Sequence, residues 1–99
     1  MKEKLLKESL LDACQTSYIP FMEKGRETIL ELPRGWVLKN IHCMAMEILN
    51  LSDEWEYRRL LELYKKLDKN LLINLVNMGL KNDNEDIKEA ANDFKEVAG

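Results

Sequence analysis

Apolar residues recur along this 99-residue chain at the three- and four-residue spacing of amphipathic helices, and the pattern predicts six short helices. The most apolar helix is expected over Gly35–Leu51, where Val37, Ile41 and Ile48 belong to a broad apolar arc opposite a narrow polar stripe. Because an arc this wide needs cover from more than one neighbour, we expect this segment to be the central helix.

Capping residues and prolines predict where the other helices begin and end. A first helix over Lys2–Gln15 precedes a second that Ser17 caps and that ends near Leu32, since Pro33 starts the next helix. The expected N-caps of the last three helices are Ser52, Asp68 and Asn82. Gly79 is expected in a left-handed conformation just after the fifth helix, which we expect to be deeply buried.

The predicted fold class is all-α, with about six short antiparallel helices arranged as stacked αα-hairpins or as a compact helical bundle. Turns of a few residues favour antiparallel neighbours. The hydrophobic content of 45% and charged content of 33% are ordinary for a folded protein. We therefore expect one helical domain over residues 1–99 with one core.

The charge balance is acidic, with a formal net charge of -3. An acidic balance disfavours nucleic acid and anionic membrane surfaces as partners, because both are negatively charged and bind basic protein surfaces. A protein partner is the expectation that remains. Neither a secretory signal nor an apolar run of membrane-spanning length is visible, so we expect a cytoplasmic location.

The helices expected after Ser52 and after Asn82 share the spacing of their apolar positions, so the pattern repeats after thirty residues. The two matching sets are Tyr57, Leu60, Leu61, Tyr64 and Leu67, and Ile87, Ala90, Ala91, Phe94 and Val97. The second helix follows the same spacing only partly, because Arg26 interrupts it.

The segment Asn82–Phe94 resembles the second helix of a HEAT-type repeat, in which a short polar turn leads into a helix with paired small residues, here Ala90 and Ala91. The resemblance covers mainly residues 71–97 and extends more loosely over Ile41–Leu67. The proline of many such repeats is absent, and Lys88 stands roughly in the place of their basic residue. The resemblance implies stacked helical hairpins and a role in holding another protein.

Few residues suggest catalysis. His42 is the only histidine, and Cys43 lies about 100° from it around a helix, so the two do not form a nucleophilic pair. We expect His42 to be a boundary residue bonded by a neighbour, and Cys14 and Cys43 to be buried free thiols. No metal-ligand spacing or phosphate-binding loop is visible, and we expect neither a cofactor nor a metal.

The tryptophans suggest a binding surface. Trp55 is predicted to project away from the apolar face of its helix, among Arg58, Arg59 and Glu62 on the solvated side. Tryptophan outside the core is a favoured interface anchor, so these four residues form the candidate contact patch. Trp36 is a second candidate, unless the first or second helix covers it. The alternative for Trp55 is that it folds back over the preceding loop.

Two classes of function follow. The first is a small acidic protein-binding module, such as an adaptor or an immunity-type inhibitor. In a variant of this class the partner is a second copy of the chain, and the protein forms a homodimer. The second is a ligand-binding or minor enzymatic bundle with an internal pocket. The residues expected to line that pocket are Met22, Met44, Met46 and Met78.

Overall fold

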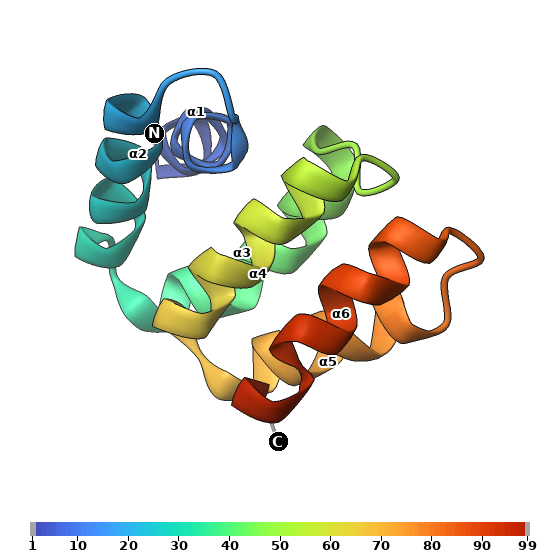
Figure 1. Ribbon diagram of the computed structural model, residues 1–99. Coiled ribbons are helices and arrows are strands. Elements are labelled where there is room, and N and C mark those ends of the chain that lie inside the picture. The colour runs from blue at the N-terminus through green and yellow to red at the C-terminus, as the bar shows by residue number, and fades with distance from the viewer. Residues whose placement is uncertain (1, 99) are drawn as a thin grey trace.

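The computed structural model describes residues 2–98, with side chains to residue 97, and this part of the chain forms six helices and no strand (Figure 1). The helices are α1 (Lys2–Cys14), α2 (Ile19–Glu31), α3 (Arg34–Ile48), α4 (Glu54–Leu67), α5 (Lys69–Leu80) and α6 (Glu85–Ala98). The predicted all-α fold is confirmed. None of the helices within this part has the length and hydropathy of a membrane span.

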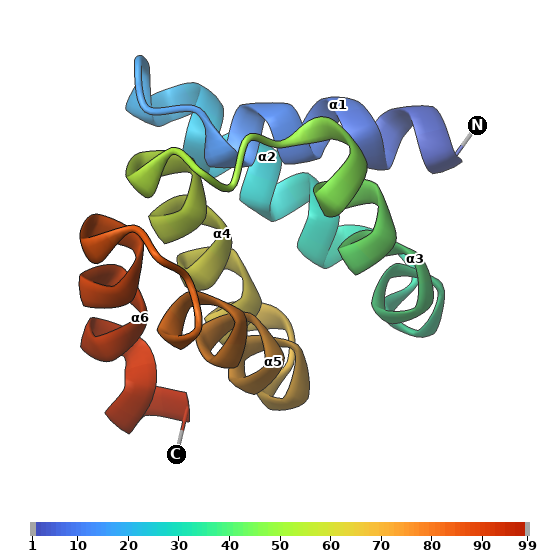
Figure 2. The ribbon, with the colours of Figure 1, turned by 90° about the vertical axis from the view of Figure 1, so that its right-hand side faces the viewer.

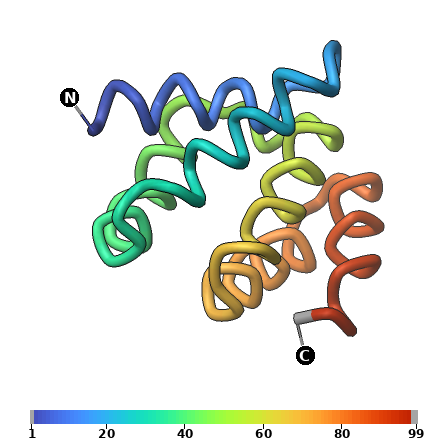
Figure 3. Tube along the Cα trace, turned by 90° about the vertical axis from the view of Figure 1, so that its left-hand side faces the viewer, coloured from blue at the N-terminus to red at the C-terminus, as the bar shows by residue number. Residues whose placement is uncertain are grey.

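Short turns join the six helices, and two of the consecutive pairs pack closely. α1 packs closely on α2, and α5 packs closely on α6. In Figure 1 the α1–α2, α3–α4 and α5–α6 loops lie along the upper and right-hand sides, and the α2–α3 and α4–α5 connections lie at the lower left and bottom. Figures 2 and 3 show that α3 diverges from α4, while α1 lies across the top of both. One cluster of buried side chains joins all six helices.

The prediction that the most apolar helix is central was wrong, because α1 and α4 each pack against three other helices and α3 does not. α4 packs against α1, α5 and α6, whereas α3 contacts mainly α1. In α3 the buried residues are Val37, Ile41 and Ala45, and Ile48 is only half-buried. Apolar content predicts that a helix is buried, but the number of helices around it depends on how the chain folds back.

The buried face of α4 is as predicted, with Leu63 as an addition. The matching face of α6 buries Ile87, Ala90 and Ala91, but Phe94 is half-buried and Val97 is exposed. α5 buries one side only and exposes Met78, so it is not the deeply buried helix expected. Both corrections have one reason: α5 and α6 form the last pair and have neighbours on one side only.

Three expected caps lie one or two residues from the observed ones. The carboxylate of Asp53, rather than Ser52, accepts from the backbone N–H groups of the first turn of α4. Asn84, rather than Asn82, accepts similarly at α6. α2 begins after Tyr18 without a side-chain cap, so Ser17 has no such role. Asp68 caps α5 as predicted.

Gly79 lies inside α5 and has no positive φ, so the predicted left-handed ending was wrong. A Cβ atom on Gly79 would lie 2.8 Å from the Cβ atom of Ala91 and closer still to the hydroxyl of Tyr57. That hydroxyl donates a hydrogen bond of 2.7 Å to the Leu75 carbonyl. The glycine is needed because α4, α5 and α6 approach closely here.

Candidate functional site

The exposed side of α4 carries a stripe of four residues at helical spacing, Trp55, Arg59, Glu62 and Lys66. α2 and α6 flank this stripe (Figure 1). We call the resulting surface the α4 face. Its residues are Met22, Glu23, Arg26, Glu27, Leu30, Trp55, Arg58, Arg59, Glu62, Lys65, Lys66 and Phe94.

Trp55 stands at one end of the α4 face and is 59% exposed, so the preceding loop does not cover it. Its backbone N–H is held by the Asp53 cap, 2.8 Å from the carboxylate oxygen. The guanidinium carbon of Arg58 lies 5.8 Å from the centre of a Trp55 ring, within the range of a cation–π contact. The indole is therefore positioned by its neighbours while one side of it faces solvent.

Arg58 links α4 to α6 and is largely covered, with 19% of its side chain exposed. Its guanidinium donates to Glu54 Oε2 and to Asp93 Oδ2, each at 2.8 Å. Burial opposes the charged form, but the two carboxylates hold the pKa of Arg58 above its usual value. The predicted solvated role is therefore wrong for Arg58, which holds two helices together and orients Trp55.

Glu62 joins α4 to α2 through an ion pair, as Arg58 joins α4 to α6. Its Oε1 atom accepts from Arg59 Nη1 at 3.0 Å and from Arg26 Nη2 on α2. Arg26 is 14% exposed, and its buried Nε has no hydrogen-bond partner within the part of the chain that the structure describes. Arg59 and Glu62 are thus half-buried members of an ion-pair cluster rather than freely solvated residues.

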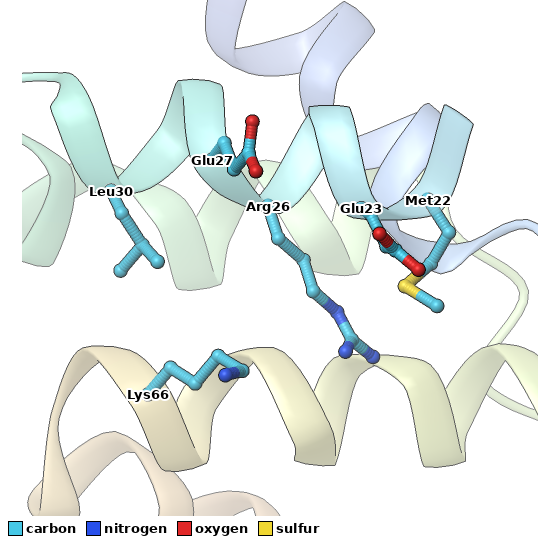
Figure 4. A pocket seen from close by; sticks show the side chains of 6 residues that line it. All are labelled: Met22, Glu23, Arg26, Glu27, Leu30 and Lys66. Carbon is cyan, nitrogen blue, oxygen red and sulfur yellow. The ribbon is translucent and has the colours of Figure 1, made fainter. Parts of the chain in front are cut away.

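Two adjacent pockets lie farther along the α4 face from Trp55. The first, of about 370 Å³, lies between α2 and α4 and is lined by Met22, Glu23, Arg26, Glu27, Leu30 and Lys66. In Figure 4, Arg26 crosses from α2 to α4 and Lys66 extends along α4 toward it, while the Glu27 carboxylate stays beside α2. The second, of about 310 Å³, is lined by Arg26, Glu62, Lys65, Lys66 and Phe94. Arg26 and Lys66 line both pockets, so the two pockets lie side by side, and we call them together the groove.

Trp36 does not belong to this surface. Arg34, at the start of α3, donates to the Leu67 carbonyl at 3.0 Å and to Asp68 Oδ1 at 3.2 Å, so this end of α3 lies at the C-terminal end of α4. Trp55 lies at the opposite end of a helix about 20 Å long. Trp36 is half-buried against the core, and the Lys2 ammonium lies 5.6 Å from its ring centre, so α1 covers it in part.

The side chains that could perform nucleophilic chemistry are separated or inactive. His42 Nδ1 lies 3.2 Å from the hydroxyl of buried Tyr64, in line with the predicted boundary role. Burial raises the pKa of the Cys14 thiol to about 12, so it stays protonated at neutral pH. Cys43 is exposed, contrary to the prediction that both thiols are buried. Within the described residues no group of His, Cys, Asp and Glu is arranged to hold a metal.

The four methionines do not meet in one internal pocket. Met22 lines the groove of the α4 face, and Met78 lines a smaller pocket beside Gly79. Met46 is exposed on α3, and Met44 is half-buried. Of the groove residues only Glu62 was among the predicted binding residues, and the sequence signal for one that was missed, Arg26, was its interruption of the apolar spacing of the second helix.

No family model, curated protein or solved structure matches this chain. The α4 face must therefore be interpreted from its own geometry and charges.

Proposed function

We propose that this protein is a protein-binding module that holds its partner along the α4 face. The observation that carries the proposal is a mostly exposed tryptophan on the same helical stripe of α4 as Glu62 and Lys66, which line the groove. Tryptophan and arginine are the residue types that most often dominate binding energy at protein interfaces. The cluster around Glu62 supports the proposal because it fixes the distance between the two walls of the groove before any partner arrives.

The length of the stripe on α4 suits a short segment of a partner. From Trp55 to Lys66 the stripe rises about 16 Å, the length of three helical turns or of about five residues of extended chain. Such a segment would contact Trp55 at one end and enter the groove between α2 and α4 at the other. Helix-in-groove recognition uses this kind of surface.

The proposal includes the two forms that the sequence suggested, an adaptor and an immunity-type inhibitor. Stacking of HEAT-like hairpins is consistent with it, because such modules hold partners on the helices of one face. A cytoplasmic location belongs to the same proposal. Each of these refinements depends on the identity of the partner.

Photo-crosslinking in the host cell tests the proposal. A photoreactive phenylalanine analogue is placed at Glu23, which lines the groove, and in a matched variant at Asn74, an exposed residue of α5. We expect a discrete adduct with one other protein from position 23 and none from position 74. Equal adducts from both positions, or none from position 23, would contradict the proposal. An adduct between two copies of the chain would replace the separate partner with a homodimer.

A further inference from the structure

The second pocket of the α4 face differs in charge from the rest of the protein. Three cationic side chains, Arg26, Lys65 and Lys66, line it together with one carboxylate, that of Glu62, and with Phe94. We call it the basic pocket. It has two more positive than negative groups, although the whole chain has a net charge of -3. A local excess of positive charge on an acidic protein selects for an anionic ligand at this place.

The positive charges of the basic pocket are poorly compensated from within. Glu62 is shared between Arg26 and Arg59, so one carboxylate faces two guanidinium groups before either lysine is considered. Neither Lys65 nor Lys66 forms an ion pair within the part of the chain whose side chains are described. Arg26 is already paired with Glu62 and its Nε is buried, so the cations open to a ligand are Lys65 and Lys66. A carboxylate from outside would therefore meet cations that are still available for pairing.

The basic pocket also has an apolar wall. Phe94 of α6 is half-buried and faces the pocket beside the lysines. The adjoining pocket adds Leu30 and Met22 on α2. A ligand that has a carboxylate next to an apolar side chain therefore matches both the cations and the apolar wall of the basic pocket. A nucleic acid matches less well, because its chain of phosphates would extend beyond the basic pocket to Glu23 and Glu27 of the adjoining pocket, whereas a single carboxylate would not.

We propose that the basic pocket binds an acidic residue of the protein partner, with its carboxylate beside Lys65 and Lys66 and a neighbouring apolar side chain against Phe94. This rests on the proposed function and deepens it, because it specifies the partner's contact segment as acidic and apolar.

Peptide titration monitored by NMR tests this inference directly. The probe is a synthetic hexapeptide with two central glutamates flanked by leucines, compared with the same peptide carrying glutamines. We expect the amide signals of Lys65, Lys66 and Phe94 to shift, and the glutamate peptide to bind about fivefold more tightly, with the difference lost at high salt. Equal binding of the two peptides, tighter binding of a lysine peptide or of oligothymidylate, or shifts confined to other helices would overturn the inference.

Matched variants separate pocket binding from general charge. The double variant Lys65→Ala/Lys66→Ala should weaken binding of the glutamate peptide about tenfold. The double variant Lys69→Ala/Lys81→Ala removes the same charge from exposed positions on and just after α5 and should change binding less than about twofold. Equal losses in both variants would contradict a specific pocket.

The crosslinking experiment at position 23 distinguishes failure of this inference from failure of the proposed function. A partner whose crosslinked segment contains no acidic residue would overturn the basic-pocket inference and leave the protein-binding module in place. A partner segment with an acidic residue next to an apolar one would support both.

Discussion

The carboxylate of Glu62 on α4 pairs with the guanidinium of Arg26 on α2 and so joins the two helices that form the walls of the groove. The two residues are 36 positions apart in sequence. Arg59 contacts the same carboxylate oxygen, so the pair belongs to a cluster in which one acid holds two bases. The cluster therefore ties α2 to α4 at the α4 face.

Replacing Glu62 by Gln should destabilise the fold by about 1–2 kcal/mol, because two partly covered guanidinium groups then lack their carboxylate. The urea midpoint of unfolding measures this change. Glu27→Gln is the matched control, since Glu27 is exposed and forms no ion pair within the described residues, and it should stay within about 0.5 kcal/mol of wild type. If the two variants have the same midpoint, the cluster does not hold the groove together.

Gly79→Ala should destabilise the protein by about 2–4 kcal/mol, because the added methyl group would overlap the Tyr57 hydroxyl and press on Ala91. Gly35→Ala, also within a helix, meets no atom within 4 Å and should be neutral or stabilise by up to about 1 kcal/mol. Thermal unfolding of both variants checks the pair. A mild effect at position 79 would show that α5 and α6 are packed more loosely than described.

The two thiols should react at very different rates in the folded protein. Cys43 is exposed, whereas Cys14 is buried with its pKa raised by burial. A chromogenic disulfide reagent should therefore titrate one thiol quickly and the second only on unfolding. Cys43→Ser should remove the fast phase. Rapid reaction of both thiols in the native state would contradict the burial of Cys14 beneath the ion-pair cluster.

Stability should fall on the alkaline side. Burial raises the pKa of Cys14 from 9.0 to about 12 and that of Tyr57 from 10.0 to about 12, and it raises that of Tyr64 as well. Because the folded state favours the protonated forms, their contribution is complete below about pH 9 and is lost as the pH rises toward about 12. Urea midpoints measured across this range should decline steadily.

Tyr57→Phe tests the source of the alkaline loss of stability. It should reduce the pH dependence of the urea midpoint, because it removes a hydroxyl whose pKa burial raises to about 12. A midpoint that does not vary from about pH 9 to 12 would contradict the buried environment of these groups.

Local patterns predicted the helices well, because each amphipathic stripe and several caps lie within a few neighbouring residues. The buried stripe of α4 and the Asp68 cap are examples. The capping residues of α4 and α6 were misplaced because polar residues stand side by side there, and the sequence does not indicate which one the backbone uses. Gly79 resembled a helix ending because the close approach of Tyr57 is a tertiary contact.

The candidate site was predictable only in part. The exposure of Trp55 follows from its position opposite the apolar face of α4. The pairing of Glu62 with Arg26, and of Arg58 with Asp93, joins residues more than thirty positions apart, and no local pattern specifies such pairs. Trp36 was grouped with the binding candidates because helical position alone does not reveal that α1 lies over it.

The most direct test of the α4 face is the dissociation constant of the complex between this protein and the partner captured by crosslinking, measured for wild type and for Trp55→Ala. The reference variant is Met46→Ala, which removes another exposed apolar side chain from α3. We predict that Trp55→Ala weakens binding about tenfold or more while its urea midpoint stays near wild type, and that Met46→Ala changes binding less than about twofold. Unchanged affinity for Trp55→Ala, or an equal loss for Met46→Ala, would contradict a partner bound along the α4 face.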